Sequence, residues 1–310
     1  MRELAPTELA EVACNTEMTD NADILKSAAV TIEVGSKSFS LASKFFDEET
    51  YKSAILLYAW CRYCDDQIDE VIDHQTKMAR LDRLFIHTKA AFARDKAPGP
   101  IFLGLQTIAR QHSFSKNHAL ELLEGMAMDL RGESYTSLSQ MEVYCYRVAG
   151  VVGLMMCQIM GVKDSRAYQH ASSLGSAMQM TNIARDILDD ALMGRCYLPE
   201  EWLKSAGLNR QNHVMLEHRS ALAQVVSKLL DEAESRYEFG NAGIKYLPFR
   251  AALAISAASA IYREIGKKIL KLQTHAWDQR VVVPLPRKIV ICLSAFARLL
   301  LQRTLRKSGD

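Results

Sequence analysis

Residues 54–73 read AILLYAWCRYCDDQIDEVID, an apolar run that becomes acidic halfway along. Asp65 and Asp69 share one face of the predicted helix, because residues four apart are neighbours on an α-helix. Asp66 lies about 100° further around the same helix. Like charges at this spacing repel, and they repel more strongly where water is excluded. We therefore expect cations between these carboxylates.

A second run, LGSAMQMTNIARDILDD (174–190), carries another oxygen-bearing stripe opposite an apolar face. The stripe consists of Gln179, Asn182, Asp186 and Asp190. Carboxylate and amide oxygens are hard ligands that suit Mg²⁺ or Mn²⁺. Two such stripes predict a pair of facing helices that hold divalent metal ions, with a substrate phosphate completing the coordination.

Three arginines lie close in sequence to the two stripes. Their guanidinium groups suit a phosphate that the metals also hold. The three are Arg62, Arg185 and Arg195.

A simpler alternative applies to any single pair of aspartates four residues apart, because such a pair is usually a solvated helix face. Asp69 and Asp73 repeat the spacing where the flanking sequence is polar, so we expect Asp73 at the surface. A non-catalytic helical scaffold is the alternative from another class of protein. It would explain the helices but not two acidic stripes in apolar surroundings.

Outside these runs the sequence predicts one all-α domain. No proline occurs between Pro100 and Pro199, and strand-type alternation is almost absent. Helices are predicted at 22–34, 48–72, 76–95, 100–112, 116–131, 138–161, 164–191, 198–204, 217–240, 247–272 and 285–306.

Composition excludes several classes of protein. The net charge of +2 is too balanced for a nucleic-acid binder. Dinucleotide, Walker, nucleophile-elbow and zinc-protease motifs do not occur. Apolar runs stay short of a membrane span, no secretory signal is apparent, and the odd number of cysteines favours a reducing cytoplasm. Cys61 and Cys64 form a lone CxxC, for which core packing is favoured over a metal or redox site.

Four motifs in order, from 58 to 199, resemble the squalene and phytoene synthases, head-to-head prenyltransferases. They are YAWCRYCDDQID (58–69), YCYRVAGVVG (144–153), NIARDILDD (182–190) and GRCYLP (194–199). The sequences of these motifs are more similar to those of bacterial phytoene synthases than to those of squalene synthases. The resemblance implies a single-domain isoprenoid synthase-type helical bundle with a central active-site cavity, over residues 21–310. Residues 1–20 form an N-terminal extension without a recognised counterpart.

The resemblance also implies a role for individual residues. Metal ligands would be Asp65, Asp69, Asn182, Asp186 and Asp190. Catalytic residues would be Arg62, Tyr144, Arg185 and Arg195. Substrate-binding residues would be Ser36, Ser38, Phe39, Tyr58, Asp66, Gln179, Asp189, Tyr262 and Arg280. The phenol and phenyl rings of Tyr144, Tyr146 and Phe39 are candidates to stabilise a carbocation.

The implied reaction joins two geranylgeranyl diphosphates 1′–1 through prephytoene diphosphate to phytoene, with Mg²⁺ or Mn²⁺ and without NADPH. Dehydrosqualene or squalene synthesis from farnesyl diphosphate is the alternative. Small residues would either keep a tunnel open for the C20 tails or serve close helix packing: Ala149, Gly150, Gly153 and Gly161. The basic amphipathic segment 288–307 predicts either contact with the inner face of a membrane or a terminal helix packed on the bundle. The oligomeric state is not visible in the sequence.

Overall fold

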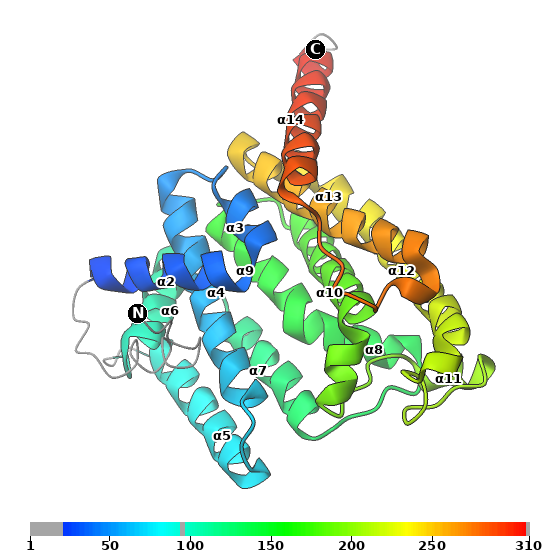
Figure 1. Cartoon of the computed structure of the whole chain (residues 1–310). Helices are drawn as coiled ribbons and strands as arrows, with labels where there is room; N and C mark the ends of the chain where they lie inside the picture. The colour runs from blue at the N-terminus through cyan, green and yellow to red at the C-terminus, as the bar shows by residue number, and fades with distance from the viewer. Residues whose placement is uncertain (1–20, 94–96, 308–310) are drawn as a thin grey trace, which may run out of the picture.

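The computed structural model describes residues 21–93 and 97–307, whose regular structure is helical throughout (Figure 1). The predicted extension 1–20 lies outside this part of the chain. The main helices are α2 (Asn21–Gly35), α3 (Lys37–Ser43), α4 (Glu48–Asp69), α5 (His74–Ala91), α6 (Pro100–His112), α7 (Lys116–Leu130), α8 (Leu138–Cys145), α9 (Val151–Ile159), α10 (Arg166–Leu192), α11 (Glu200–Ser205), α12 (Arg219–Asn241), α13 (Phe249–Leu272) and α14 (Leu285–Lys307).

Polar caps set the start of α4, which carries the first acidic stripe, and of α5, which follows it. The Asp47 carboxylate accepts the amide of Thr50 and begins α4. Helix α4 ends at Asp69, three residues before the predicted end at 72, and Asp73 lies beyond it. Asp73 instead caps α5 by accepting the amide of Thr76. It is exposed, as predicted.

The predicted single helix 138–161 contains a break in its regular winding. Residues Tyr146–Gly150 form a π-helical turn between α8 and α9. Such turns add a residue to the helix and are frequent at functional sites. The expected helices also omitted α3, whose first turn is capped by the Ser36 hydroxyl, an acceptor for the amide of Phe39.

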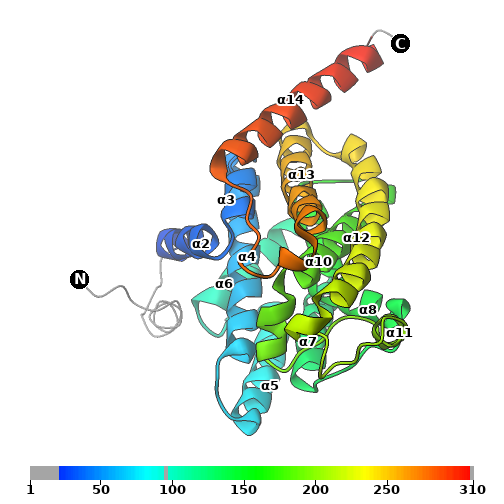
Figure 2. The same cartoon turned by 45° about the vertical axis from the view of Figure 1, so that its right-hand side comes forward.

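Two large apolar clusters flank the acidic stripes. One is built mainly on α2, α4, α5, α6, α7 and α9, and the other mainly on α8, α10, α12 and α13. Helix α10 runs through the middle of the molecule (Figures 1 and 2). Its apolar residues belong to the second cluster, whereas those of α4 belong to the first. The first stripe therefore emerges from one cluster and the second stripe from the other.

Helices α9 and α10 pack with their backbones in close contact. A Cβ atom on Gly153 would lie 2.3 Å from the carbonyl oxygen of Ala171, and one on Gly175 would lie 2.3 Å from that of Ala149. Gly150 likewise faces serine hydroxyls of α10. The packing alternative is therefore confirmed at Gly150 and Gly153.

The remaining glycine of that expected group has a different task. Gly161 has φ +69° and ends α9 in a turn, so it needs the left-handed backbone that glycine adopts without strain. It is exposed and does not pack against a neighbouring helix, because nothing lies within 4 Å of a Cβ built there.

Helix α14 crosses α13 near the start of α13 and projects beyond it (Figures 1 and 2). Ala295 and Leu299 pack on Ala252 and Leu253 near the start of α13, while Arg287 pairs with Glu264 in its second half. The predicted terminal helix packed on the bundle is confirmed for this face. Across the described residues, no helix combines the length and hydropathy that a bilayer span requires.

Candidate active site

The first acidic stripe lies at the end of α4 against an arginine of the same helix. Arg62 contacts Asp66 at 2.6 Å and Asp65 at 3.7 Å. Burial and the neighbouring Asp69 raise the pKa of Asp65, and Arg62 opposes them. The side chain nonetheless keeps 48% of its surface accessible, which leaves it open to a ligand.

The second stripe contains a kink in α10. Asp186 has non-helical backbone angles (φ −103°, ψ 16°) inside the helix. The Trp277 indole donates to the carbonyl of Ala184 at 2.9 Å, just before the kink, and inserted side chains are a known cause of helix bends. The Asp186 carboxylate contacts Arg185 at 2.5 Å and Arg280 at 3.0 Å. Arg280, close to the C-terminal helix, thus contacts the second stripe.

Arg195 joins the two stripes. It follows α10 in the chain, and its guanidinium contacts Asp69 of α4 at 2.7 Å. Burial lowers the pKa of Arg195, but the carboxylates of Asp129 and Asp69 outweigh burial and raise it. This arginine therefore remains a cation between the two acidic helices.

Asp129, at the end of α7, lies at the same place, and the sequence analysis missed it. It accepts hydrogen bonds from the hydroxyls of Tyr144 at 3.0 Å and Tyr197 at 2.8 Å. The two phenol rings stack with centroids 4.6 Å apart. The sequence did contain a signal for this residue. Asp129 follows the apolar residues 126–128, as the aspartates of the two stripes follow apolar runs.

Several carboxylates here lie in surroundings that disfavour their ionised form. Burial raises the pKa of Asp129 to about 6, although Arg195 and the two tyrosine hydroxyls oppose it. Burial and Asp186 raise the pKa of Asp190 to about 8. Ionised carboxylates at these positions repel one another in a partly desolvated environment, which is the setting that favours bound cations.

The start of α3 lies against Tyr58 of α4. The rings of Phe39 and Tyr58 are 5.9 Å apart, and a Cβ on Gly35 would lie 2.4 Å from the Tyr58 hydroxyl. Burial raises the pKa of Tyr58 to about 12, and the nearby Tyr262 of α13 contributes. Tyr262 also raises the pKa of Arg185. The structure therefore brings Phe39, Tyr58 and Tyr262 to the two stripes.

Four other expected residues lie as follows. Asp189 is exposed on α10, beside Asp190 in sequence. Ser36 serves as the cap of α3, and Ser38 is half-buried in its first turn. Tyr146 lines a separate open recess with Glu142 and Ser176, none of whose lining residues belongs to the acidic stripes.

The amides of the second stripe test whether the residues fit a metal ion. Asn182 donates to Gln179 at 3.3 Å, while its own Oδ1 is buried with no hydrogen-bond partner among the described residues. An orphaned amide oxygen one turn before Asp186 is a suitable hard donor for Mg²⁺. Within residues 21–93 and 97–307, no three His, Cys, Asp or Glu side chains already converge on one point. The donor set fits, and the metal-binding role stays a prediction.

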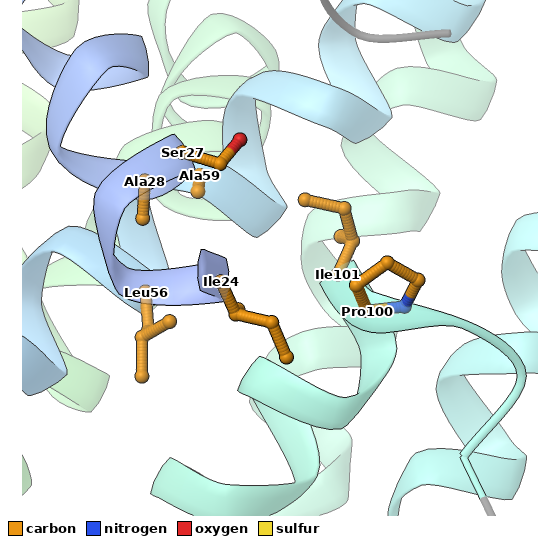
Figure 3. A pocket seen from close by; sticks show the side chains of 7 residues that line it. All are labelled: Ile24, Ser27, Ala28, Leu56, Ala59, Pro100 and Ile101. Carbon is orange, nitrogen blue, oxygen red and sulfur yellow. The ribbon is translucent and has the colours of Figure 1, made fainter. Parts of the chain in front are cut away.

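Other features of the chain lie apart from this chemistry. Figure 3 shows a mostly apolar recess between α2, α4 and α6, lined among others by Ile24, Leu56 and Pro100. Cys61 and Cys64 lie one turn apart on α4, and burial raises the pKa of both thiols. Core packing, the favoured reading of the CxxC, agrees with this burial.

Comparisons with known proteins agree with this geometry. A crystal structure of a dehydrosqualene synthase with bound ligand matches with a TM-score of 0.79, at 25% identity, over 90% of this chain and 97% of that one. A squalene synthase from Alicyclobacillus acidocaldarius shares the fold, with a TM-score of 0.72 at 23% identity, covering 88% and 97%. The chain therefore has the all-α isoprenoid synthase fold.

Sequence relatives narrow the class. The model of the squalene/phytoene synthase family matches residues 32–287. A 15-cis-phytoene synthase of Pantoea ananas is 44% identical over 292 residues, covering 92% of this chain and 94% of the relative. A phytoene synthase of Pseudescherichia vulneris is 43% identical, covering 91% and 94%. The chain belongs to the squalene/phytoene synthase family.

Proposed function

We propose that the chain is a phytoene synthase, a prenyltransferase of carotenoid biosynthesis that condenses two geranylgeranyl diphosphates head to head. The observation that carries the reaction class is the contact of Arg195 with Asp69, which places a guanidinium group between the two carboxylate stripes. Ionising a diphosphate requires concentrated positive charge, which this arginine and divalent ions held by the stripes would supply. The 44% identity to a 15-cis-phytoene synthase supports the choice of C20 substrate and product. Farnesyl diphosphate remains the alternative substrate, and product analysis separates the two.

Two groups of residues would assist ionisation of the diphosphate. Asp65, Asp69, Asn182, Asp186 and Asp190 would hold the divalent ions. Bound Mg²⁺ or Mn²⁺ would neutralise charge on the departing diphosphate. The guanidinium groups that now contact these carboxylates, those of Arg62, Arg185, Arg195 and Arg280, would donate to the diphosphate oxygens.

The reaction then needs a dry, non-nucleophilic environment. When the C1–O bond breaks, its electrons leave with the diphosphate, and water would quench the allylic cation left behind. Phe39 and Tyr58 would cover the diphosphate end, and the Tyr144 ring would face the cation by cation–π attraction. A second ionisation, rearrangement and loss of a proton would complete phytoene. No hydride enters, so NADPH is not required.

Charge removal at the stripes tests the metal assignment. Asp65→Asn or Asp186→Asn keeps the side-chain size and removes a ligand charge. We expect each to lower Mg²⁺-dependent diphosphate release by at least ~100-fold with the fold intact, since a metal-held leaving group carries several kcal/mol of the barrier. Asp73→Asn is the control, because Asn also caps α5. Near-normal turnover in both stripe variants would remove the assignment.

Product analysis tests the substrate. With C15 and C20 diphosphates side by side, we expect phytoene from the C20 substrate and no effect of NADPH on rate or product. Each buried CH₂ contributes roughly 0.8 kcal/mol, so five extra carbons provide enough energy for selection by length. Preference for the C15 diphosphate, or a product two hydrogens richer with NADPH, contradicts phytoene synthesis and leaves the metal test unaffected. The predicted cytoplasmic location is proposed with this activity.

A further inference from the structure

The second stripe bends at the residue that carries one of its two carboxylates. Asp186 has φ −103° and ψ 16°, outside the α-helical range. In a straight α-helix each step of four residues turns the side chain by about 40°, so Asn182 and Asp190 would point about 80° apart. A change of backbone angles at Asp186 alters that angle. The bend therefore sets how the amide and the two carboxylates would face a bound ion.

Trp277 contacts the helix just before the bend. Its side chain is buried in the second apolar cluster, and its Nε1 donates to the carbonyl oxygen of Ala184 at 2.9 Å. In a regular α-helix the amide of Leu188 donates to that carbonyl, so the indole competes with it. A side chain that enters the ladder of helical hydrogen bonds is a known cause of a bend. We attribute the bend at Asp186 to this contact.

Arg219, the first residue of α12, lies over the ring of Trp277. Its Cζ atom is 5.5 Å from the ring centroid. Its Nε and Nη1 atoms are buried and have no hydrogen-bond partner among the described residues. A cation is attracted to an aromatic face, and more strongly where water is excluded. The indole ring therefore accounts for the position of a guanidinium group whose buried donors are unused.

We propose that Arg219 and Trp277 are positioning residues, which together hold the bend that aims the Asp186 carboxylate at a divalent ion. The proposal rests on the metal-binding role proposed above for Asp186. Neither side chain supplies a ligand, because the pair acts through the backbone of α10, whereas Arg280 contacts the carboxylate itself. Loss of the pair should weaken metal binding although every ligand remains in the chain.

Titration of Mn²⁺ into the full chain tests this role, with inorganic diphosphate present and the free ion followed by electron paramagnetic resonance. Trp277→Phe keeps an aromatic ring and removes the donor to Ala184. We expect its affinity for Mn²⁺ to fall about tenfold, the lower end of the range for residues that support a metal ligand. A titration without protein corrects for Mn²⁺ bound by diphosphate alone.

Trp202→Phe is the matched control for the tryptophan. Trp202 lies in the same apolar cluster, is 6% exposed against 7% for Trp277, and has the Lys228 ammonium group 4.3 Å from its ring centroid. Its affinity for Mn²⁺ should stay close to that of the wild type. Equal affinities of Trp277→Phe and Trp202→Phe would overturn the proposal.

Paired substitutions at Arg219 test the cation. Arg219→Lys keeps a positive charge over the ring and should retain an affinity near that of the wild type, whereas Arg219→Gln should lower it roughly threefold. Lys228→Gln removes the cation over Trp202 and should change nothing. Equal affinities of the two Arg219 variants would overturn the part assigned to Arg219.

Steady-state diphosphate release separates positioning from a general loss of structure. For Trp277→Phe we expect the apparent KM for Mg²⁺ to rise about tenfold, with kcat at saturating Mg²⁺ nearly unchanged. A smaller folded fraction would instead lower kcat and leave this KM as it is, and that result would overturn the proposal. A wild-type chain that binds no Mn²⁺ would remove the metal assignment and this proposal together. A wild type that binds Mn²⁺ no better than Trp277→Phe would remove this proposal alone.

Discussion

At the scale of single residues, Asp129 connects two tyrosines with the acidic stripes. It holds two tyrosine hydroxyls and lies within electrostatic reach of both acidic stripes. A carboxylate that accepts two hydroxyl donors fixes the orientation of both rings. The stacked pair Tyr144 and Tyr197 is therefore positioned by Asp129, and through Arg195 this cluster connects to the first stripe.

This linkage predicts non-additive effects on catalysis. Tyr197→Phe and Asp129→Asn should each lower kcat by roughly 10-fold or more with KM little changed, because the binding groups remain while Tyr144 loses its fixed position. The double variant should be no slower than the slower single variant. Steady-state kinetics of the three variants measure this. Fully multiplicative losses would show that the residues act independently.

A second prediction concerns the pH dependence of stability. In the unfolded chain Asp190 titrates near 3.8, and in the folded chain burial and Asp186 raise its pKa to about 8. The fold thus favours the protonated form, and this stabilisation is present at low pH and lost as pH rises toward about 8. In a chelator, Asp190→Asn should lose less melting temperature than the wild type between about pH 5 and about pH 8. Parallel melting curves would contradict the raised pKa.

At the scale of secondary structure, the sequence predicted helix positions well because proline, glycine and caps mark them locally. The π-helical turn Tyr146–Gly150 and helix α3 escaped prediction. Both depend on contacts with distant residues, such as the serine hydroxyls of α10 against Gly150 and Tyr58 against Gly35. The stripes were predictable because each aspartate recurs after one turn. Asp129 has no second carboxylate one turn away in α7, so its signal in the sequence was weaker and its role depended on two tyrosines that the fold brings to it.

The α9–α10 contact gives a prediction at the same scale. Gly153→Ala would force a methyl group against the Ala171 carbonyl oxygen, a backbone atom that cannot rotate away. We expect a loss of about 1–3 kcal/mol in the free energy of unfolding. Gly266→Ala is the control, since its Cβ would meet only the flexible end of Leu230 at 3.2 Å and alanine favours a helix. Urea denaturation compares them, and equal midpoints would contradict close backbone packing.

For the whole molecule, the arrangement of two apolar clusters explains how so much negative charge is tolerated. Each cluster supplies one helix whose polar end reaches the boundary between them, so neither core has to enclose the carboxylates. Arg195 then joins the two halves at that boundary through its ion pair with Asp69, while Arg280 pairs with Asp186 within the second half. The sequence indicated that the stripes face each other. It also placed Arg195 and Arg280 among the site residues, but not the carboxylate that each contacts, because both ion pairs join residues far apart in the chain.

The segment between α13 and α14 has a thermodynamic consequence. Trp277 and Arg280 attach this segment to Ala184 and Asp186, and α14 begins five residues after Arg280. A diphosphate held at Asp186 and Arg280 would also hold this segment, and linkage requires that the segment in turn strengthens diphosphate binding by the same free energy. Amide hydrogen exchange in residues 277–284 should therefore slow when Mg²⁺ and a prenyl diphosphate are added. Arg280→Gln should reduce this slowing, and exchange that the ligand leaves unchanged would show that the segment is not linked to the site.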